Sequence, residues 1–229
     1  MAEITINAGG DGSFTAYVAN QQGVRGRPGL LLIHEGSGLD QTMRELADDL
    51  SLNGYIVVCP DLFWRLKPNP RPDRPASATL DRDLATFDVD RAVEDLKAAL
   101  EHMRGMQQIN GKVGVIGYAL GGQLAYLMMT RSTADAGVSY YAVGLERRLD
   151  TAFAITKPYM AHMAGQDRFV PATAQNAIRD AFGRNPNISL NLFGAQAHAF
   201  ARVGGENWDR RAATAANELT AEFFRQYLV

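Results

Sequence analysis

Short apolar runs recur along the chain and alternate with segments of helical periodicity. Residues 4–6 and 14–18 alternate apolar and polar positions on either side of an Asp11-Gly12 turn signal, which predicts an N-terminal hairpin. The later runs are continuous, as expected of strands buried on both faces of a parallel sheet. They lie at residues 30–33, 55–58, 113–116, 138–141, 159–163 and 188–193.

Three amphipathic stripes accompany these strands, each with the three- and four-residue spacing of a helix face. The stripes consist of Met43, Leu46, Ala47 and Leu50; of Val89, Val93, Leu96 and Leu100; and of Leu219, Phe223 and Tyr227. Strands that alternate with helices predict an α/β fold, a mostly parallel doubly wound sheet with helices on both faces. The sequence shows no repeat or interdomain linker, so we predict one domain over residues 1–229.

The composition excludes several classes of partner. The chain of 229 residues is 46% hydrophobic and has a formal net charge of −2, so it offers no electrostatic basis for binding nucleic acid. No signal-peptide pattern begins the chain, and no apolar run approaches the roughly 20 residues that span a bilayer. The single cysteine, Cys59, allows no intrachain disulfide, which suits a reducing compartment. We expect a cytoplasmic monomer with no nucleic-acid or membrane partner.

Residues 62–87 interrupt the regular pattern. The segment holds four prolines and four arginines: Pro68, Pro70, Pro72, Pro75, Arg65, Arg71, Arg74 and Arg82. A stretch this rich in proline is not expected to form one regular element. It is either a solvated surface loop or part of a pocket wall.

The segment Gly117-Tyr118-Ala119-Leu120-Gly121 is the most informative part of the chain. Glycines two residues before and after Ala119 form the pattern of a nucleophile elbow, a sharp strand-to-helix turn that projects its central residue. A methyl group cannot attack a carbonyl, so Ala119 cannot supply the nucleophile. The alternative is a turn whose glycines serve close packing alone. Nucleotide binding has little support, because the sequence contains neither glycine-rich nucleotide motif.

Residues further along the chain favour the elbow. Asp167 and His198 each follow a predicted strand, in the order nucleophile, acid, histidine that this fold requires. Either residue alone would suit a capping Asp or a surface His, but both in this order indicate an acid–base pair. His34 ends a strand and precedes Glu35 and Gly36, where a hydrolase places its second oxyanion amide. The remaining histidines, inside a predicted helix and a predicted strand, are weaker candidates: His102 and His162.

With these residues the chain resembles the dienelactone hydrolase (carboxymethylenebutenolidase) family over nearly its whole length. The narrowest shared motifs are the glutamate after His34 and the G-Y-x-L-G-G elbow. Other shared segments are residues 60–62, 140–141, 143–146, 165–171 and 198–202. The resemblance implies a cysteine nucleophile at position 119, in a Cys-His-Asp triad with Asp167 and His198. It also implies that Glu35 helps to generate the thiolate when an anionic substrate binds.

The resemblance further implies a substrate, a carboxylate-bearing enol lactone that is opened to maleylacetate. The oxyanion would be held by the N–H groups of Leu120 and Gly36. Arg202 matches a family arginine that holds the substrate carboxylate. The position of the second family arginine falls near Ser77, and this sequence has no arginine at the matching position. The residues we expect at the substrate are therefore Arg202, Tyr141 and, in place of the missing arginine, Arg82 or Arg74. We expect no cofactor and no metal, since no metal-ligand spacing of Cys or His is visible.

Two explanations for Ala119 stay open. It is either an engineered Cys→Ala (less readily Ser→Ala) exchange or the native residue of a ligand-binding relative without catalysis. We favour the first, because Glu35, Asp167, His198 and Arg202 are all retained. A related esterase or lactonase that acts on other substrates is also an alternative, because the arginines of this chain differ from the family pattern.

Overall fold

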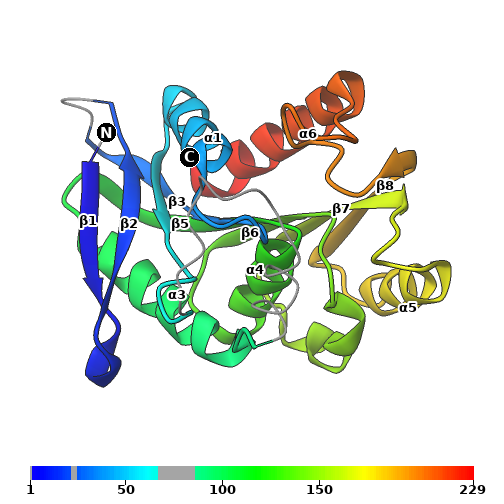
Figure 1. Cartoon of the computed structure of the whole chain (residues 1–229), viewed down its shortest axis with the longest axis horizontal. Helices are drawn as coiled ribbons and strands as arrows, with labels where there is room; N and C mark the ends of the chain where they lie inside the picture. Colours follow the sequence, from blue (N-terminus) through cyan, green and yellow to red (C-terminus); the bar gives the residue numbers. More distant parts are fainter. Residues whose placement is uncertain (1, 22–24, 67–85) are drawn as a thin grey trace. The chain divides into compact units, whose positions relative to one another are not determined.

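The computed structural model describes residues 2–21, 25–66 and 86–229 (Figure 1). It divides into two compact units, Met1–Gly114 and Val115–Val229. Strand β5 (Ile109–Tyr118) begins in the first unit and ends in the second. Among the described residues the strands number eight and are mostly parallel, so the predicted α/β class is confirmed. The single domain over the whole chain stays a prediction.

The first unit begins with an antiparallel hairpin of β1 (Ala2–Asn7) and β2 (Ser13–Ala19), as the alternating pattern predicts. Strand β2 pairs antiparallel with β4 (Ile56–Pro60), and β4 pairs parallel with β3 (Arg27–Ile33). The order in this unit is β1-β2-β4-β3, with β5 next to β3. Residues 30–33 and 56–59 are fully buried, as continuous apolar runs predict.

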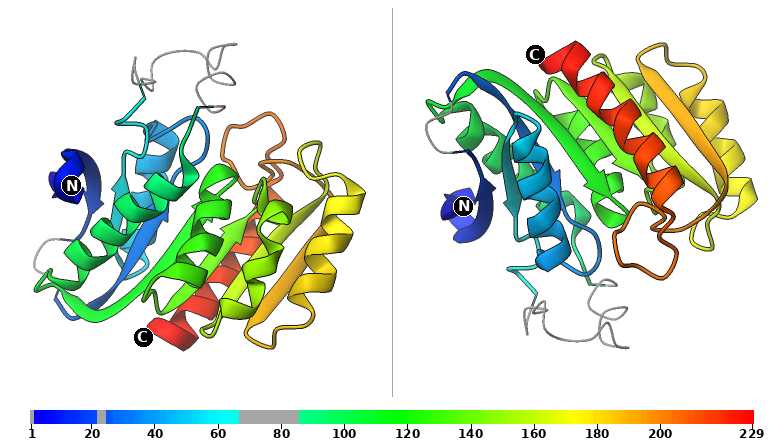
Figure 2. Two further views of the ribbon diagram at one scale, coloured as in Figure 1. Left: turned by 90° about the horizontal axis from the view of Figure 1, so that it is seen from below. Right: turned by 90° about the horizontal axis from the view of Figure 1, so that it is seen from above.

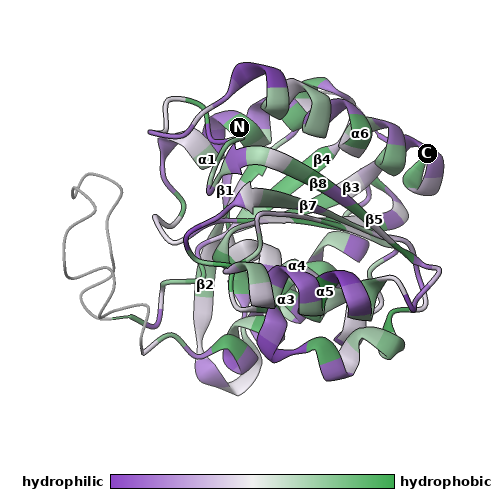
Figure 3. Ribbon diagram, turned by 90° about the vertical axis from the view of Figure 1, so that its right-hand side faces the viewer, coloured by the Kyte–Doolittle hydropathy of each residue, from purple (hydrophilic) through white to green (hydrophobic). Residues whose placement is uncertain are grey.

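Helices α1 (Gln41–Leu52) and α3 (Val89–Arg104) cover opposite faces of the first unit's strands (Figure 3). Each begins at an aspartate whose carboxylate accepts backbone N–H groups of the first turn, Asp40 for α1 and Asp88 for α3. Such caps satisfy donors that the helix leaves unpaired at its start. Cys59 is buried within β4, and His102 lies on the exposed side of α3, so neither is placed for catalysis.

The second unit carries the end of β5, then β6 (Ala136–Tyr140), β7 (Tyr159–Gln166) and β8 (Ile188–Ala197), of which the last three pair in parallel. Helices α4 (Leu120–Arg131) and α5 (Ala172–Phe182) lie on one face of these strands, and α6 (Arg210–Leu228) lies on the other (Figure 2). Alternation along β7 shows why both faces are covered. Tyr159 packs against Tyr126 and Phe182 on the α4 and α5 side, whereas His162 meets Thr220 of α6.

One helix of the second unit was missed, and two predictions about this unit need correction. Helix α5 was not predicted, although Ala174, Ile178 and Phe182 form its buried stripe. The stripe of α6 was misplaced: Leu219 and Tyr227 are 38% and 37% exposed, because the helix buries another set of residues. That set is Ala212, Ala213, Ala216, Thr220, Phe223, Phe224 and Leu228. Finally, the apolar run at residues 188–193 predicted a strand buried on both faces. This prediction was wrong, because β8 is the edge strand of the unit and is only half buried.

No helix in the described ranges is both long enough and apolar enough to cross a bilayer. The expected cytoplasmic location and monomeric state stay predictions.

Candidate active site

The elbow of the second unit joins the end of β5 to the start of α4. Ala119 stands at the helix N-cap with φ 50° and ψ −110°, a backbone conformation that residues with a Cβ rarely adopt. Its N–H donates to the Tyr140 carbonyl oxygen at 3.0 Å, and its own carbonyl accepts from the Gly122 N–H at 3.0 Å. The Leu120 N–H, at the first position of α4, has no acceptor within the described part of the chain. The turn therefore presents the side chain of residue 119 and a free amide together.

Glycine at position 117 is required by the closeness of this turn. A Cβ at Gly117 would overlap the carbonyl oxygen of Gly121, which belongs to the helix backbone and cannot move independently. We expect Gly117→Ala to lower the free energy of unfolding by about 3 kcal/mol or more. Chemical denaturation measures this loss. Gly194→Ala is the control, because a Cβ there meets no atom within 4 Å, and an equal loss in both variants would contradict the packing argument.

His198 and Asp167 form a hydrogen-bonded pair in the same unit. The Nδ1 atom of His198 lies 2.8 Å from Oδ2 of Asp167, and the other carboxylate oxygen accepts the Phe169 N–H at 2.9 Å. Because a carboxylate only accepts, Nδ1 donates this hydrogen bond, and in the neutral form of the ring the lone pair is then on Nε2. Asp167 follows β7 and His198 follows β8, so the ends of two paired parallel strands bring the residues together. The pair has the geometry of a general base oriented by an acid.

Two aromatic rings hold the imidazole of His198 from its sides. Tyr141 contacts it edge-on with ring centroids 5.2 Å apart, and Phe169 does so at 4.7 Å. Tyr141 is itself buried, and this burial, together with the nearby Tyr140 and Asp167, raises the pKa of its hydroxyl. Its ring packs against the histidine, and the contact of Tyr141 with substrate stays a prediction. The sequence did not single out Phe169, although it stands two residues after the acid.

Backbone strain concentrates around these residues. In the described ranges, the residues other than glycine with positive φ are Ala119, Tyr141 and Ala199, at 50°, 36° and 62°. One forms the elbow, one follows β6 and packs on His198, and one directly follows His198. Each such conformation costs on the order of 1–3 kcal/mol and persists where the surrounding structure holds it, often at functional sites. The strain thus marks the same part of the second unit as the predicted chemistry.

In the first unit, the chain after β3 carries the predicted oxyanion loop. His34 is completely buried, with Nδ1 2.8 Å from the Glu35 carbonyl oxygen, while Nε2 accepts the Leu62 N–H at 3.1 Å. Burial lowers the pKa of His34 to about 4, against the opposing influence of Asp61 and Asp40. The neutral imidazole therefore fixes the backbone of Glu35, whose side chain is also buried. His34 positions the loop, and the roles of Glu35 and Gly36 stay predictions.

Of the arginines predicted to bind substrate, the structure describes Arg202 and not Arg74 or Arg82. Arg202 lies four residues after His198 and is half-buried, and this loss of solvent lowers its pKa. Arg82 and Arg74 lie outside the described residues. Arg168, which the sequence analysis passed over, stands beside Asp167 with its guanidinium over the ring of Phe169, 4.7 Å from the centroid. Its place directly after the predicted acid was the available signal.

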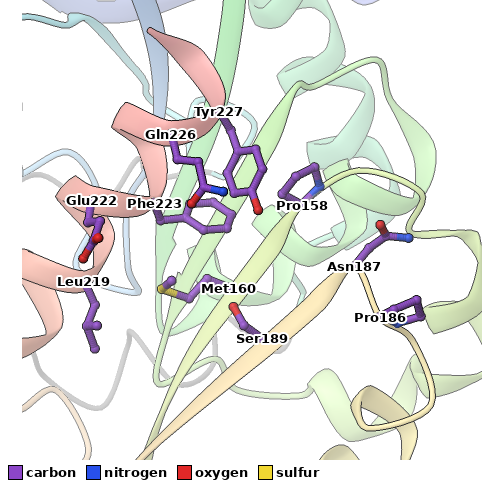
Figure 4. Close-up of a pocket in the computed structure, with 10 residues that line it drawn as sticks. All are labelled: Pro158, Met160, Pro186, Asn187, Ser189, Leu219, Glu222, Phe223, Gln226 and Tyr227. Atoms are coloured by element: carbon purple, nitrogen blue, oxygen red, sulfur yellow. The ribbon is translucent and has the colours of Figure 1, made fainter.

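A cavity of about 310 Å³ opens elsewhere in the second unit, between α6 and the first residues of β7 and β8 (Figure 4). Phe223 and Tyr227 of α6 face Pro158 and Met160 across it (Figure 4). Its lining contains no histidine, no cysteine and none of the strained residues. This cavity therefore holds none of the residues predicted for catalysis.

The parallel strands and the strand–elbow–helix turn place the chain in the α/β-hydrolase class. A sequence model of the dienelactone hydrolase family matches residues 14–228. The chain is 38% identical to carboxymethylenebutenolidase 1 of Cupriavidus pinatubonensis, over 96% of this chain and 94% of that protein. It is 37% identical to the carboxymethylenebutenolidase of Pseudomonas putida, over 86% of this chain and 84% of that protein.

Solved structures agree at the level of the fold. A dienelactone hydrolase-like promiscuous phosphotriesterase from metagenomic libraries superposes with a TM-score of 0.85 at 18% identity, covering 100% of this chain and 98% of that one. The chain belongs to the dienelactone hydrolase family. This membership confirms the predicted resemblance and supports a hydrolase function.

Proposed function

We propose that the chain is a lactone hydrolase of the dienelactone type in which alanine occupies the place of the nucleophilic cysteine. The observation that carries the proposal is the 2.8 Å hydrogen bond between His198 and Asp167, which leaves Nε2 as a base. The strained backbone of Ala119 supports it, since a methyl group gains nothing from that conformation. The relatives named carboxymethylenebutenolidase suggest the substrate, a carboxylate-bearing enol lactone. As it stands, the chain binds this substrate and turns it over very slowly.

With cysteine at position 119, the reaction would proceed in two steps. His198 takes the proton of the thiol, and the thiolate attacks the lactone carbonyl. The Sγ–C bond forms, and the ring C–O bond breaks to leave an enolate, which takes that proton back from His198 and tautomerises to the ketone. His198 then removes a proton from water, which attacks the thioester and releases the new carboxylate and the thiol. The Leu120 N–H is the oxyanion donor of the second unit, and Gly36 stays the predicted second donor. Restoring the thiol with Ala119→Cys tests the proposal.

Arg202 is proposed to bind the carboxylate of the substrate. We expect Arg202→Ala to weaken binding of a carboxylate-bearing lactone by about 10- to 100-fold, the usual cost of losing a charged hydrogen-bonding partner. A neutral aryl ester should lose less than about 2-fold. Calorimetric titration of both ligands into the Ala119 protein measures the difference. If both ligands weaken equally, Arg202 does not face the substrate carboxylate.

A second candidate function is a ligand-binding protein in which Ala119 is native. Ala119 itself is the observation that favours it, because the described elbow contains no other nucleophile. The codon at position 119 of the natural gene distinguishes a native alanine from an exchanged cysteine. Among enzymes, an esterase or lactonase with other substrates is the alternative, and a substrate panel on the Ala119→Cys protein distinguishes it.

A further inference from the structure

Three side chains contact one another in a row that begins at the proposed base. The rings of His198 and Phe169 lie nearly perpendicular with their centroids 4.7 Å apart, and the guanidinium carbon of Arg168 lies over the Phe169 ring, 4.7 Å from its centroid. The guanidinium of Arg168 and the imidazole of His198 therefore contact the same ring, that of Phe169. We infer that Arg168 determines specificity in this site by binding a carboxylate of the substrate beside His198. The inference rests on the proposed function and names a residue that recognises its substrate class.

The charge of Arg168 is available to a ligand. Its side chain is exposed, and in the described part of the chain it makes no ion pair. The nearest carboxylate in sequence, Asp167, is buried, and its two oxygens already accept from His198 and from the Phe169 N–H. An anionic ligand therefore breaks no ion pair when it binds Arg168. It replaces only water around the guanidinium.

The ring of Phe169 gives the cation a preferred position. Stacking on an aromatic face uses the plane of the guanidinium, while its N–H donors lie at the edge and stay free for a partner. Two parallel N–H donors match the two oxygens of a carboxylate. Phe169 is 47% exposed, so the stack reaches the surface of the second unit and is open to a small molecule. A flexible lysine would supply the same charge but neither the plane nor the fork.

The position of Arg168 also bears on the second arginine that the sequence lacks in register near Ser77. Arg168 stands next to the acid of the proposed pair and stacks on the residue that holds the base. It supplies the charge from the second unit itself, independently of any residue in the segment 67–85.

A matched pair of ligands tests the inference: the carboxylate-bearing dienelactone and its neutral methyl ester, titrated into the Ala119 protein. We expect Arg168→Gln to weaken binding of the acid by about 10-fold and of the ester by less than about 2-fold. Arg168→Lys should recover part of the affinity for the acid. Arg179→Gln removes the same charge from an exposed position on α5 and is the control, expected to leave both constants unchanged. Equal losses for acid and ester, or none for either, would overturn the assignment.

The readout separates this inference from the proposed function. In the Ala119→Cys protein, Arg168→Gln is expected to raise KM for the acid while kcat changes little, because binding is lost equally in ground state and transition state. If Ala119→Cys brings no turnover but Arg168 still discriminates acid from ester, the proposed function fails and the inference stands. If turnover appears and KM for the acid does not respond to Arg168→Gln, the inference alone fails.

Discussion

Replacing Ala119 with cysteine is expected to raise the rate of dienelactone opening by at least about 1000-fold, since loss of a nucleophile in comparable hydrolases costs more than that. The elbow already holds residue 119 in the strained conformation at the start of α4. A thiol at a helix N-terminus ionises more easily, and the developing oxyanion can accept the Leu120 N–H. The loss of ultraviolet absorbance of the lactone measures the rate.

Two variants control this experiment. Ala119→Gly changes the elbow without adding a nucleophile and should remain as slow as the alanine form. An alkylating thiol reagent should abolish the activity gained by Ala119→Cys, because Cys59 is fully buried within β4 and is not the reactive group. Burial raises the pKa of the Cys59 thiol, which keeps it protonated and unreactive. A cysteine variant no faster than the alanine form would refute the nucleophile assignment.

Removing the base should cancel most of that gain. In the Ala119→Cys protein, His198→Gln is expected to lower kcat by about 10⁴-fold, because the imidazole oriented by Asp167 is the proposed base that activates water. Asp167→Asn should cost about 10³- to 10⁴-fold, since an amide can donate to Nδ1 and stabilise the wrong tautomer. Steady-state kinetics with the dienelactone measure both losses.

The matched control for the base is His102→Gln, which removes an exposed histidine from α3 and should leave kcat unchanged. Thermal unfolding of each variant shows whether a loss of rate is a loss of fold. His162 is a poor control, because its ring is buried against Thr220 and its replacement would disturb the core. Burial lowers the pKa of His162 to about 3, so this ring is neutral and serves packing. Full activity in the His198→Gln protein would remove the base from the mechanism.

The apolar pattern predicted the strands well and the helices less evenly. Continuous apolar runs marked β3 to β7 because these strands are buried on both faces. The run at β8 has the same composition, yet β8 is an edge strand, and no local pattern reveals which strand lacks a neighbour. In α6, large apolar residues suggested one face, but the helix buries alanines and Thr220 against β6 and β7 and leaves Leu219 beside a cavity. Small residues let a helix approach the sheet closely, so a prediction based on the large apolar residues chose the wrong face of α6.

By itself, the sequence determined the α/β class, the elbow at Ala119 and the order of Asp167 and His198, because each depends on local periodicity or on motif spacing. Only the tertiary structure decided that Asp167 and His198 share a hydrogen bond, and that Phe169 and Arg168 extend outward from the imidazole. The ends of β7 and β8 lie 31 residues apart in the chain, as the separation of the bonded side chains shows. Their meeting follows from parallel pairing of the two strands, which aligns their carboxyl ends and which no local pattern encodes.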